Sequence, residues 1–170
     1  MAPTLSPEKQ LAGFIDKFTP ETASLIRAAR KKMRALLPDA VELVYDNYNF
    51  FVIGYGPTDR PSEAVFSIAA QARGVSLCFL HGASLPDPHK ILRGGGNVVR
   101  NVRLESAATL ERAEVRALID AARQRSPKPF GGGEHRLIIR SVSAKQRPRR
   151  PVEKATKKKR AKTKRSPPRR

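Results

Sequence analysis

The chain has 170 residues, with 34 Lys and Arg against 15 Asp and Glu, and its formal net charge is +19. Residues 145–170 contain 14 of the basic residues and one acid, so they carry +13 and residues 1–144 carry +6. One cysteine excludes an intrachain disulfide, and neither an apolar run long enough to span a membrane nor a secretion signal is present. We therefore expect a soluble, cytoplasmic protein.

The first two predicted elements are amphipathic helices. Ser6 followed by Pro7, and Thr19 followed by Pro20, are typical of helix starts, because the hydroxyl caps the first turn and proline suits its first position. Apolar residues at helical spacing follow each start, and Pro38 ends the second helix.

A succession of strands follows. Short apolar and β-branched runs separated by turn residues predict strands, here at 41–45, 49–56, 63–71, 74–82 and 97–104. Residues 85–92 contain two prolines and are predicted to form a single helical turn.

The last elements are a helix and one further strand. Residues 106–125 have the spacing of an amphipathic helix, and residues 136–143 are a candidate sixth strand. Strands joined by short links favour an antiparallel sheet, and helices at the ends of the chain favour an α+β layer packing. We predict an α+β domain over residues 1–144, in which an antiparallel sheet of five or six strands packs with two N-terminal helices and one C-terminal helix.

The glycine run Gly94, Gly95 and Gly96 raises the question of a phosphate-binding loop. Such loops continue into Lys-Ser/Thr and open a helix, whereas here a Val-rich strand follows. The pattern favours a turn with positive φ that leads into a strand. The alternative is an anion bound by the backbone amides of the turn and by Arg100.

Catalytic and metal-binding patterns are sparse. Cys78 and His81 are three apart on a predicted strand and point to opposite faces, so with His89 and His135 they predict no zinc site. No spacing matches a nucleophile or an acid-base pair, which favours a protein that is not an enzyme and predicts no cofactor.

Glu42 remains open. It lies in a strand between Val41 and Leu43, so it faces away from both. One interpretation is a solvated outer face. The other is a ligand cleft, with Glu42 beside Tyr45 or Tyr48 and close to the glycine turn and Arg100; an enzyme of unknown reaction stays an alternative on this ground.

Residues 145–170 are rich in charge and lack aromatic residues, so they are predicted to be a disordered basic tail. A run of this kind is typical of an arm that binds a polyanion, and we expect contact with DNA or RNA without reading of sequence. The alternative is a solubilising tail. The candidate contacts are Lys157, Lys158, Lys159, Arg160, Lys162, Lys164 and Arg165.

The body also resembles a known family. The stretches "LLPDAVELVYDNYNFFVIGYG" and "GVSLCFLHGASLPDPHKILRGGGNVVRNVRL" are similar to the YdhG-like family of bacterial domains of unknown function, over roughly residues 20–144. The matching positions are Gly82, Ala83, Leu85, Asp87, Pro88, Leu92, Gly94 and Gly96. The resemblance implies a compact α+β domain with a frataxin-like shape. Some relatives are described as iron chaperones, which implies iron delivery as an alternative function without assigning ligands.

Overall fold

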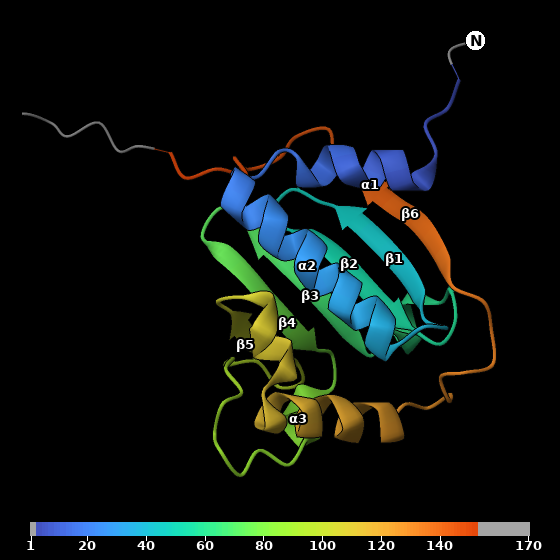
Figure 1. Cartoon of the computed structure of the whole chain (residues 1–170), viewed down its shortest axis with the longest axis vertical. Helices are drawn as coiled ribbons and strands as arrows, with labels where there is room; N and C mark the ends of the chain where they lie inside the picture. Colours follow the sequence, from blue (N-terminus) through green and yellow to red (C-terminus); the bar gives the residue numbers. More distant parts are fainter. Residues whose placement is uncertain (1–2, 153–170) are drawn as a thin grey trace, which may run out of the picture.

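The computed structural model describes residues 3–152, which form a sheet with helices packed against it (Figure 1). The α-helices of this part are α1 (Pro7–Ile15), α2 (Pro20–Leu36) and α3 (Ala113–Gln124). The strands are β1 (Val41–Asp46), β2 (Phe51–Gly56), β3 (Phe66–Gln71), β4 (Gly74–Phe79), β5 (Arg100–Leu104) and β6 (Arg136–Val142). The predicted α+β class and strand number are confirmed.

Both predicted helix starts are present. The Ser6 hydroxyl accepts a hydrogen bond from the Lys9 amide at 3.4 Å, and the Thr19 hydroxyl accepts one from the Thr22 amide at 3.3 Å. Proline occupies the beginning of α1 and of α2. These short-range bonds satisfy amides that have no partner within the helix, which is why the sequence alone locates them.

The sheet has the strand order β5-β4-β3-β2-β1-β6. Neighbouring strands from β1 to β5 are antiparallel, as expected for a chain that returns through short links. The expectation of a wholly antiparallel sheet is wrong for one pair, because β6 lies parallel to β1. The chain reaches this far edge through α3 and the loop after it, and a long connection of this kind permits parallel pairing.

The core lies between one face of the sheet and the helices. Val44, Ile53, Ile68 and Leu77 are register partners across four strands, and each is fully buried. Alternate residues of a strand share a face, so Glu42 and Asp46 point to the same side as Val44. Figure 1 shows α2 crossing this face of the sheet.

Two local predictions are wrong. Residues 85–92 are not helical; the Asp87 carboxylate instead accepts hydrogen bonds from the amides of Ile91 and Leu92 at 3.0 and 2.9 Å. The predicted helix over 106–125 is interrupted, because Ala107–Glu111 forms a 3-10 helix and α3 begins only afterwards. In the first of these places the short polar side chain of Asp87 competes with the α-helix for backbone amides.

Within the described part of the chain, none of the helices is both long and apolar enough to cross a membrane.

Candidate functional site

Two fully buried carboxylates lie on β1. Glu42 and Asp46 are both 0% exposed and share the helix-facing side of the strand. Glu42 is therefore not on a solvated outer face. Tyr45 is an odd number of residues from Glu42 and faces the other side of the sheet, so the predicted cleft between these two side chains is not formed.

Glu42 is held by cationic side chains of α2. The Arg30 guanidinium donates to both of its oxygens, from Nε at 2.9 Å and from Nη2 at 2.8 Å. The same guanidinium donates to Glu8 of α1 at 2.8 and 3.0 Å. Burial opposes the charge of Arg30, but the hydrogen bonds to Glu42 and Glu8 outweigh burial and raise the pKa of Arg30. The hydrogen bond from Arg30 lowers the pKa of Glu8. We call these residues, with His135, the Glu42 cluster.

His135 connects the Glu42 cluster to the surface. Its Nε2 lies 2.7 Å from Glu42 Oε1, and its Nδ1 lies 3.4 Å from Arg34 Nη2. The imidazole is 22% exposed, whereas the Glu42 side chain is fully buried. Both oxygens of Glu42 are engaged by protein groups, and the cluster extends from the buried Glu42 to the surface at Glu8 and His135.

Tyr55 is the register partner of Glu42 on β2 and is also 0% exposed. Among the described residues its hydroxyl has no hydrogen-bond partner. Burial, followed by the negative charge of Glu42, raises the pKa of Tyr55 well above its ordinary value of about 10. The hydroxyl therefore stays protonated in the folded protein when it ionises in the unfolded chain.

This difference predicts an alkaline loss of stability that Tyr55→Phe removes. Between the unfolded pKa and the higher folded pKa the unfolded chain binds fewer protons, so the free energy of unfolding falls as pH rises above about 10, by about 1.4 kcal/mol per pH unit. Near neutral pH the Tyr55→Phe substitution should lower the free energy of unfolding only slightly, because the lost hydroxyl has no hydrogen-bond partner among the described residues. Urea denaturation at pH 8 and pH 11 checks both statements. Tyr48→Phe, at an exposed tyrosine, is the control; equal alkaline losses for both variants and the original chain would contradict the prediction.

Asp46 fixes the segment that follows β6. Its Oδ1 accepts from Arg149 Nη2 at 2.9 Å and its Oδ2 accepts from Lys17 Nζ at 2.5 Å. Arg149 is only 5% exposed, and its guanidinium lies 5.9 Å from the centre of the Phe18 ring. Arg149 also donates to the carbonyl of Asn47. A basic side chain of the predicted tail is thus part of the core.

Backbone contacts hold the rest of this segment, residues 143–152, which we call the C-terminal strap. The Ser143 amide donates to the Asp46 carbonyl and the Arg147 amide to the Tyr48 carbonyl, both at 2.9 Å. The boundary expected at residue 144 is therefore too early, because the folded body includes the strap. Lys157, Lys158, Lys159, Arg160, Lys162, Lys164 and Arg165, the predicted nucleic-acid contacts, lie outside the described residues.

A basic cavity of about 510 Å³ opens beside the strap. Three arginines line it, Arg73 from the β3–β4 turn and Arg147 and Arg150 from the strap, and its lining contains no acid. Within residues 3–152 none of the three pairs with a carboxylate, so their charges are uncompensated by acidic partners there. We call this basic cavity the strap cavity. Its other lining residues are Asn49, Gln71, Ala72, Pro148, Pro151 and Val152.

Two exposed aromatic residues flank Asn49, which lines the strap cavity. Tyr48 and Phe50 are 50% and 42% exposed and lie on either side of Asn49 in the β1–β2 turn. The Arg147 guanidinium lies 5.7 Å from the centre of the Tyr48 ring, within the range of a cation–π contact. The turn itself is closed by a hydrogen bond from the Asn47 amide to the Phe50 carbonyl at 3.0 Å. The sequence pattern offered Tyr48, as an alternative to Tyr45, for a cleft beside Glu42; in the structure its ring lies beside Arg147 of the strap.

Another basic cavity, of about 390 Å³, lies along α2 and is lined by Arg27, Arg30, Lys31, Arg34, Ala35 and Pro38. Its arginines are largely compensated. Arg27 pairs with Asp16, and Arg30 pairs with both carboxylates of the Glu42 cluster. The strap cavity therefore offers the more available positive charge.

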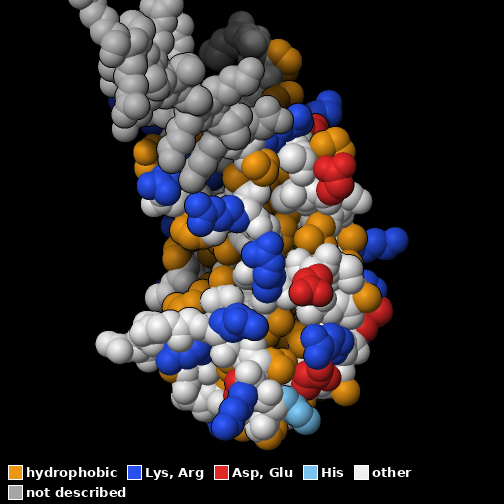
Figure 2. Space-filling view, turned by 90° about the vertical axis from the view of Figure 1, so that its left-hand side faces the viewer, with side chains coloured by type: hydrophobic (Ala, Val, Ile, Leu, Met, Phe, Trp, Pro, Cys, Tyr) orange, Lys and Arg blue, Asp and Glu red, His pale blue; other side chains and the backbone are white. Residues whose placement is uncertain are grey.

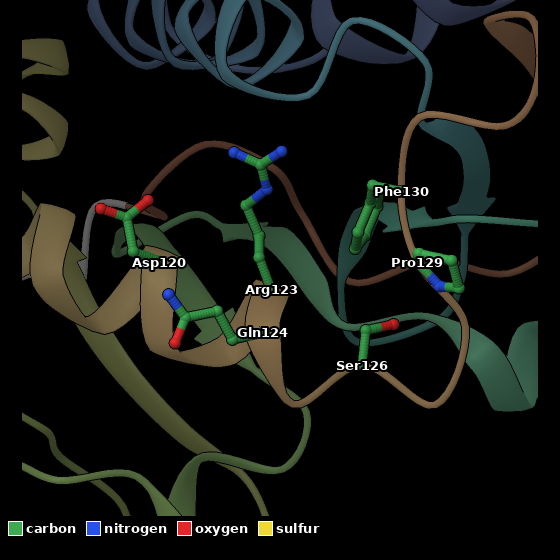
Figure 3. A pocket seen from close by; sticks show the side chains of 6 residues that line it. All are labelled: Asp120, Arg123, Gln124, Ser126, Pro129 and Phe130. Carbon is green, nitrogen blue, oxygen red and sulfur yellow. The ribbon is translucent and has the colours of Figure 1, made fainter.

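A further cavity of about 470 Å³ lies between the C-terminal end of α3 and the loop that follows it (Figure 3). Figure 3 shows Arg123 extending from the helix into the space that Phe130 borders on the other side. The remaining lining residues are Asp120, Gln124, Ser126 and Pro129. One acid and one base give this cavity no strong preference for an anion or a cation.

The glycine run forms the predicted turn before β5. Gly94 has a φ of +132°, a conformation that favours glycine, and Arg93 bridges to Asn101 across the turn. Arg100 donates to the carbonyls of its own loop, including that of Val99 at 2.9 Å. Because the Arg100 guanidinium already donates to carbonyl oxygens of this loop, it is poorly placed to bind an anion.

The six residues of the predicted ligand cleft are not brought together. Glu42 lies on β1 and Arg100 on β5, with β2, β3 and β4 between them. At about 4.8 Å per strand, the two backbones are roughly 19 Å apart. Gly94, Gly95 and Gly96 lie at the β5 edge, and Tyr45 lies on the opposite face of β1 from Glu42. The strap cavity lies apart from both of these positions, between the β3–β4 turn and the strap, and the sequence did not predict it.

Among residues 3–152 no group of three or more His, Cys, Asp or Glu side chains is arranged to hold a metal ion. Cys78 is half-buried, and burial raises the pKa of its thiol.

Comparison of the chain with protein-family models, with curated proteins and with solved structures finds no match.

Proposed function

We propose that the chain is a YdhG-like binding domain whose basic C-terminal segment contacts nucleic acid without reading sequence. The observation that supports this most strongly is the strap cavity, where Arg73, Arg147 and Arg150 gather without acidic partners among the described residues. The strap fixes one end of the basic segment against the body. Nucleic acid carries a dense row of phosphates, and uncompensated Arg and Lys side chains are the groups that bind it.

The charge of the chain supports the same proposal. Residues 153–170 add ten Lys and Arg and one Glu immediately beyond the strap. In Figure 2 Lys and Arg side chains are spread down the face turned to the viewer, whereas the Asp and Glu side chains gather on its right-hand side. A basic segment that follows a basic cavity in the chain adds positive charge, which attracts the phosphate backbone of nucleic acid.

The resemblance to the YdhG-like domains stays part of the proposal, and its most specific block has structural roles here. Asp87 closes its loop onto the amides of Ile91 and Leu92, and Gly94 supplies a positive φ. At Gly82 an added Cβ would lie 2.6 Å from the Cβ of Arg100. These residues hold the loop before β5 in place, and none of them indicates a chemical activity.

The test neutralises the seven residues Lys157, Lys158, Lys159, Arg160, Lys162, Lys164 and Arg165 to Gln in the full chain. Each contact with a phosphate of duplex DNA contributes about −0.9 to the slope of log K against log salt, so we expect the slope to become shallower by up to about six. Affinity should fall equally for unrelated sequences. Fluorescence anisotropy over a salt series measures both quantities. Unchanged affinity together with an unchanged slope would show that the segment only solubilises the protein.

A further inference from the structure

We infer that the strap cavity and the two aromatic rings beside it form a site for single-stranded nucleic acid, in which arginines hold phosphates and the rings stack on bases. This inference rests on the proposed function and specifies its ligand. In the sequence the basic segment lacks aromatic residues, so by itself it distinguishes no form of nucleic acid. In the structure Tyr48 and Phe50 lie in the β1–β2 turn, next to the strap from which this basic segment continues.

The geometry supplies both parts of such a site. Proteins that bind single strands combine a positive groove along the backbone with exposed aromatic side chains on which bases stack. Arg73, Arg147 and Arg150 provide the first from two separate segments of the chain. Tyr48 and Phe50 provide the second, and they are the only aromatic residues among the exposed large hydrophobic side chains of residues 3–152.

The aromatic turn is held in place before any ligand binds. The strap pairs with the Tyr48 carbonyl through the Arg147 amide at 2.9 Å, and the Asn47–Phe50 hydrogen bond closes the turn. Arg149 fastens the strap underneath through Asp46. A preorganised ring loses little conformational entropy when a base stacks on it.

A single strand fits these features better than a duplex. In a duplex the faces of the bases are stacked on one another, so rings on a protein surface cannot reach them without unstacking. In a single strand every base has an available face, and stacking tolerates any sequence. Asn49 and Gln71, which also line the cavity, offer amide donors to phosphate or base without requiring one base.

The experiment compares Tyr48→Ala and Phe50→Ala in the full chain with Val98→Ala, which removes an exposed apolar side chain from the loop before β5. The probes are oligothymidylate of about 12 nucleotides, a duplex of the same length, and inorganic polyphosphate, which has charge but no bases. We expect each aromatic variant to bind oligothymidylate about tenfold more weakly, since stacking energies correspond to roughly 5- to 150-fold per base. Binding of polyphosphate and the salt slope should not change.

Two further readouts identify stacking itself. Tyr48→Phe keeps the ring and should restore affinity. The chain contains no Trp and three Tyr, so its tyrosine emission is measurable, and oligothymidylate should quench it less in Tyr48→Ala than in the original chain.

The outcomes distinguish failure of the stacking site from failure of the proposed function. Equal losses for oligothymidylate and polyphosphate, or no loss for either, would overturn the stacking site and leave the proposed polyanion contact standing. A loss of binding to phosphatidylserine vesicles without any effect on oligothymidylate would assign the surface to a membrane and overturn it as well. If the original chain binds none of the three probes, the proposed function itself fails.

Discussion

Glu42→Gln is expected to lower the free energy of unfolding by about 3 kcal/mol or more. The side chain is fully buried, and its charge balances Arg30, which is 14% exposed, and faces His135. Breaking a buried ion pair by removing one partner typically costs about 3–5 kcal/mol, and Arg30 would keep only the carboxylate of Glu8, which is 56% exposed, as a counter-charge. Gln keeps the volume, so the loss reports charge rather than a cavity. Urea denaturation at neutral pH measures it.

The matched control for Glu42 is Glu111→Gln. Glu111 pairs with Lys32, but its side chain is 55% exposed, and exposed ion pairs contribute little. This variant should leave the urea midpoint almost unchanged. If Glu42→Gln behaves like Glu111→Gln, water or a rearranged Arg30 compensates the lost charge, and the ion pair of Glu42 with Arg30 does not stabilise the core.

The helix caps and Glu42 show what the sequence could and could not predict. Ser6 and Thr19 were located correctly because their bonds span three residues. The position of Glu42 stayed open between an outer face and a cleft because β1 is apolar on both faces: Leu43 and Val44, on opposite faces, are both 0% exposed. With apolar residues on both faces, alternation does not identify the side that the helices cover, so an outer, solvated position for Glu42 was consistent with the sequence.

Long-range pairing accounts for the rest. Aspartate is common in turns, and the sequence suggested this role for Asp46. Its actual partners, Lys17 and Arg149, are 29 and 103 positions away along the chain. Arg149 was hidden among 14 basic residues that looked alike. The parallel pairing of β6 with β1 likewise depends on how far α3 and its loop carry the chain. Only the folded structure brings these groups together, and the strap cavity exists because of them.

Asp46→Asn is expected to lower stability by about 3 kcal/mol and to loosen the C-terminal strap. The substitution leaves Arg149, 3% exposed in its side chain, without a counter-charge, which is the costly half of a broken buried pair. Lys17, with 41% of its side chain exposed, can return to water and contributes less. The strap would then cover the β1–β2 turn less tightly.

A double-mutant cycle separates the ion pair from general damage. Arg149→Met keeps an apolar contact with Phe18, and when it is combined with Asp46→Asn no buried charge remains, so the double variant should be more stable than Asp46→Asn alone. Urea denaturation gives the four free energies. An additive cycle would mean that the two side chains do not depend on one another.

Trypsin cleavage in the strap connects Asp46 to binding. Lys145 and Arg149 lie in the strap and precede Gln146 and Arg150. Trypsin should cut after them faster in Asp46→Asn than in Glu42→Gln, although both variants are destabilised, because only the first releases the strap. Binding of oligothymidylate should fall in parallel, since Arg147, Arg150 and the turn with Tyr48 and Phe50 would no longer be held together. Equal cleavage rates in the two variants would mean that Asp46 stabilises the fold without organising the cavity. Faster cleavage with unchanged binding would mean that the single-stranded site does not require a fixed strap.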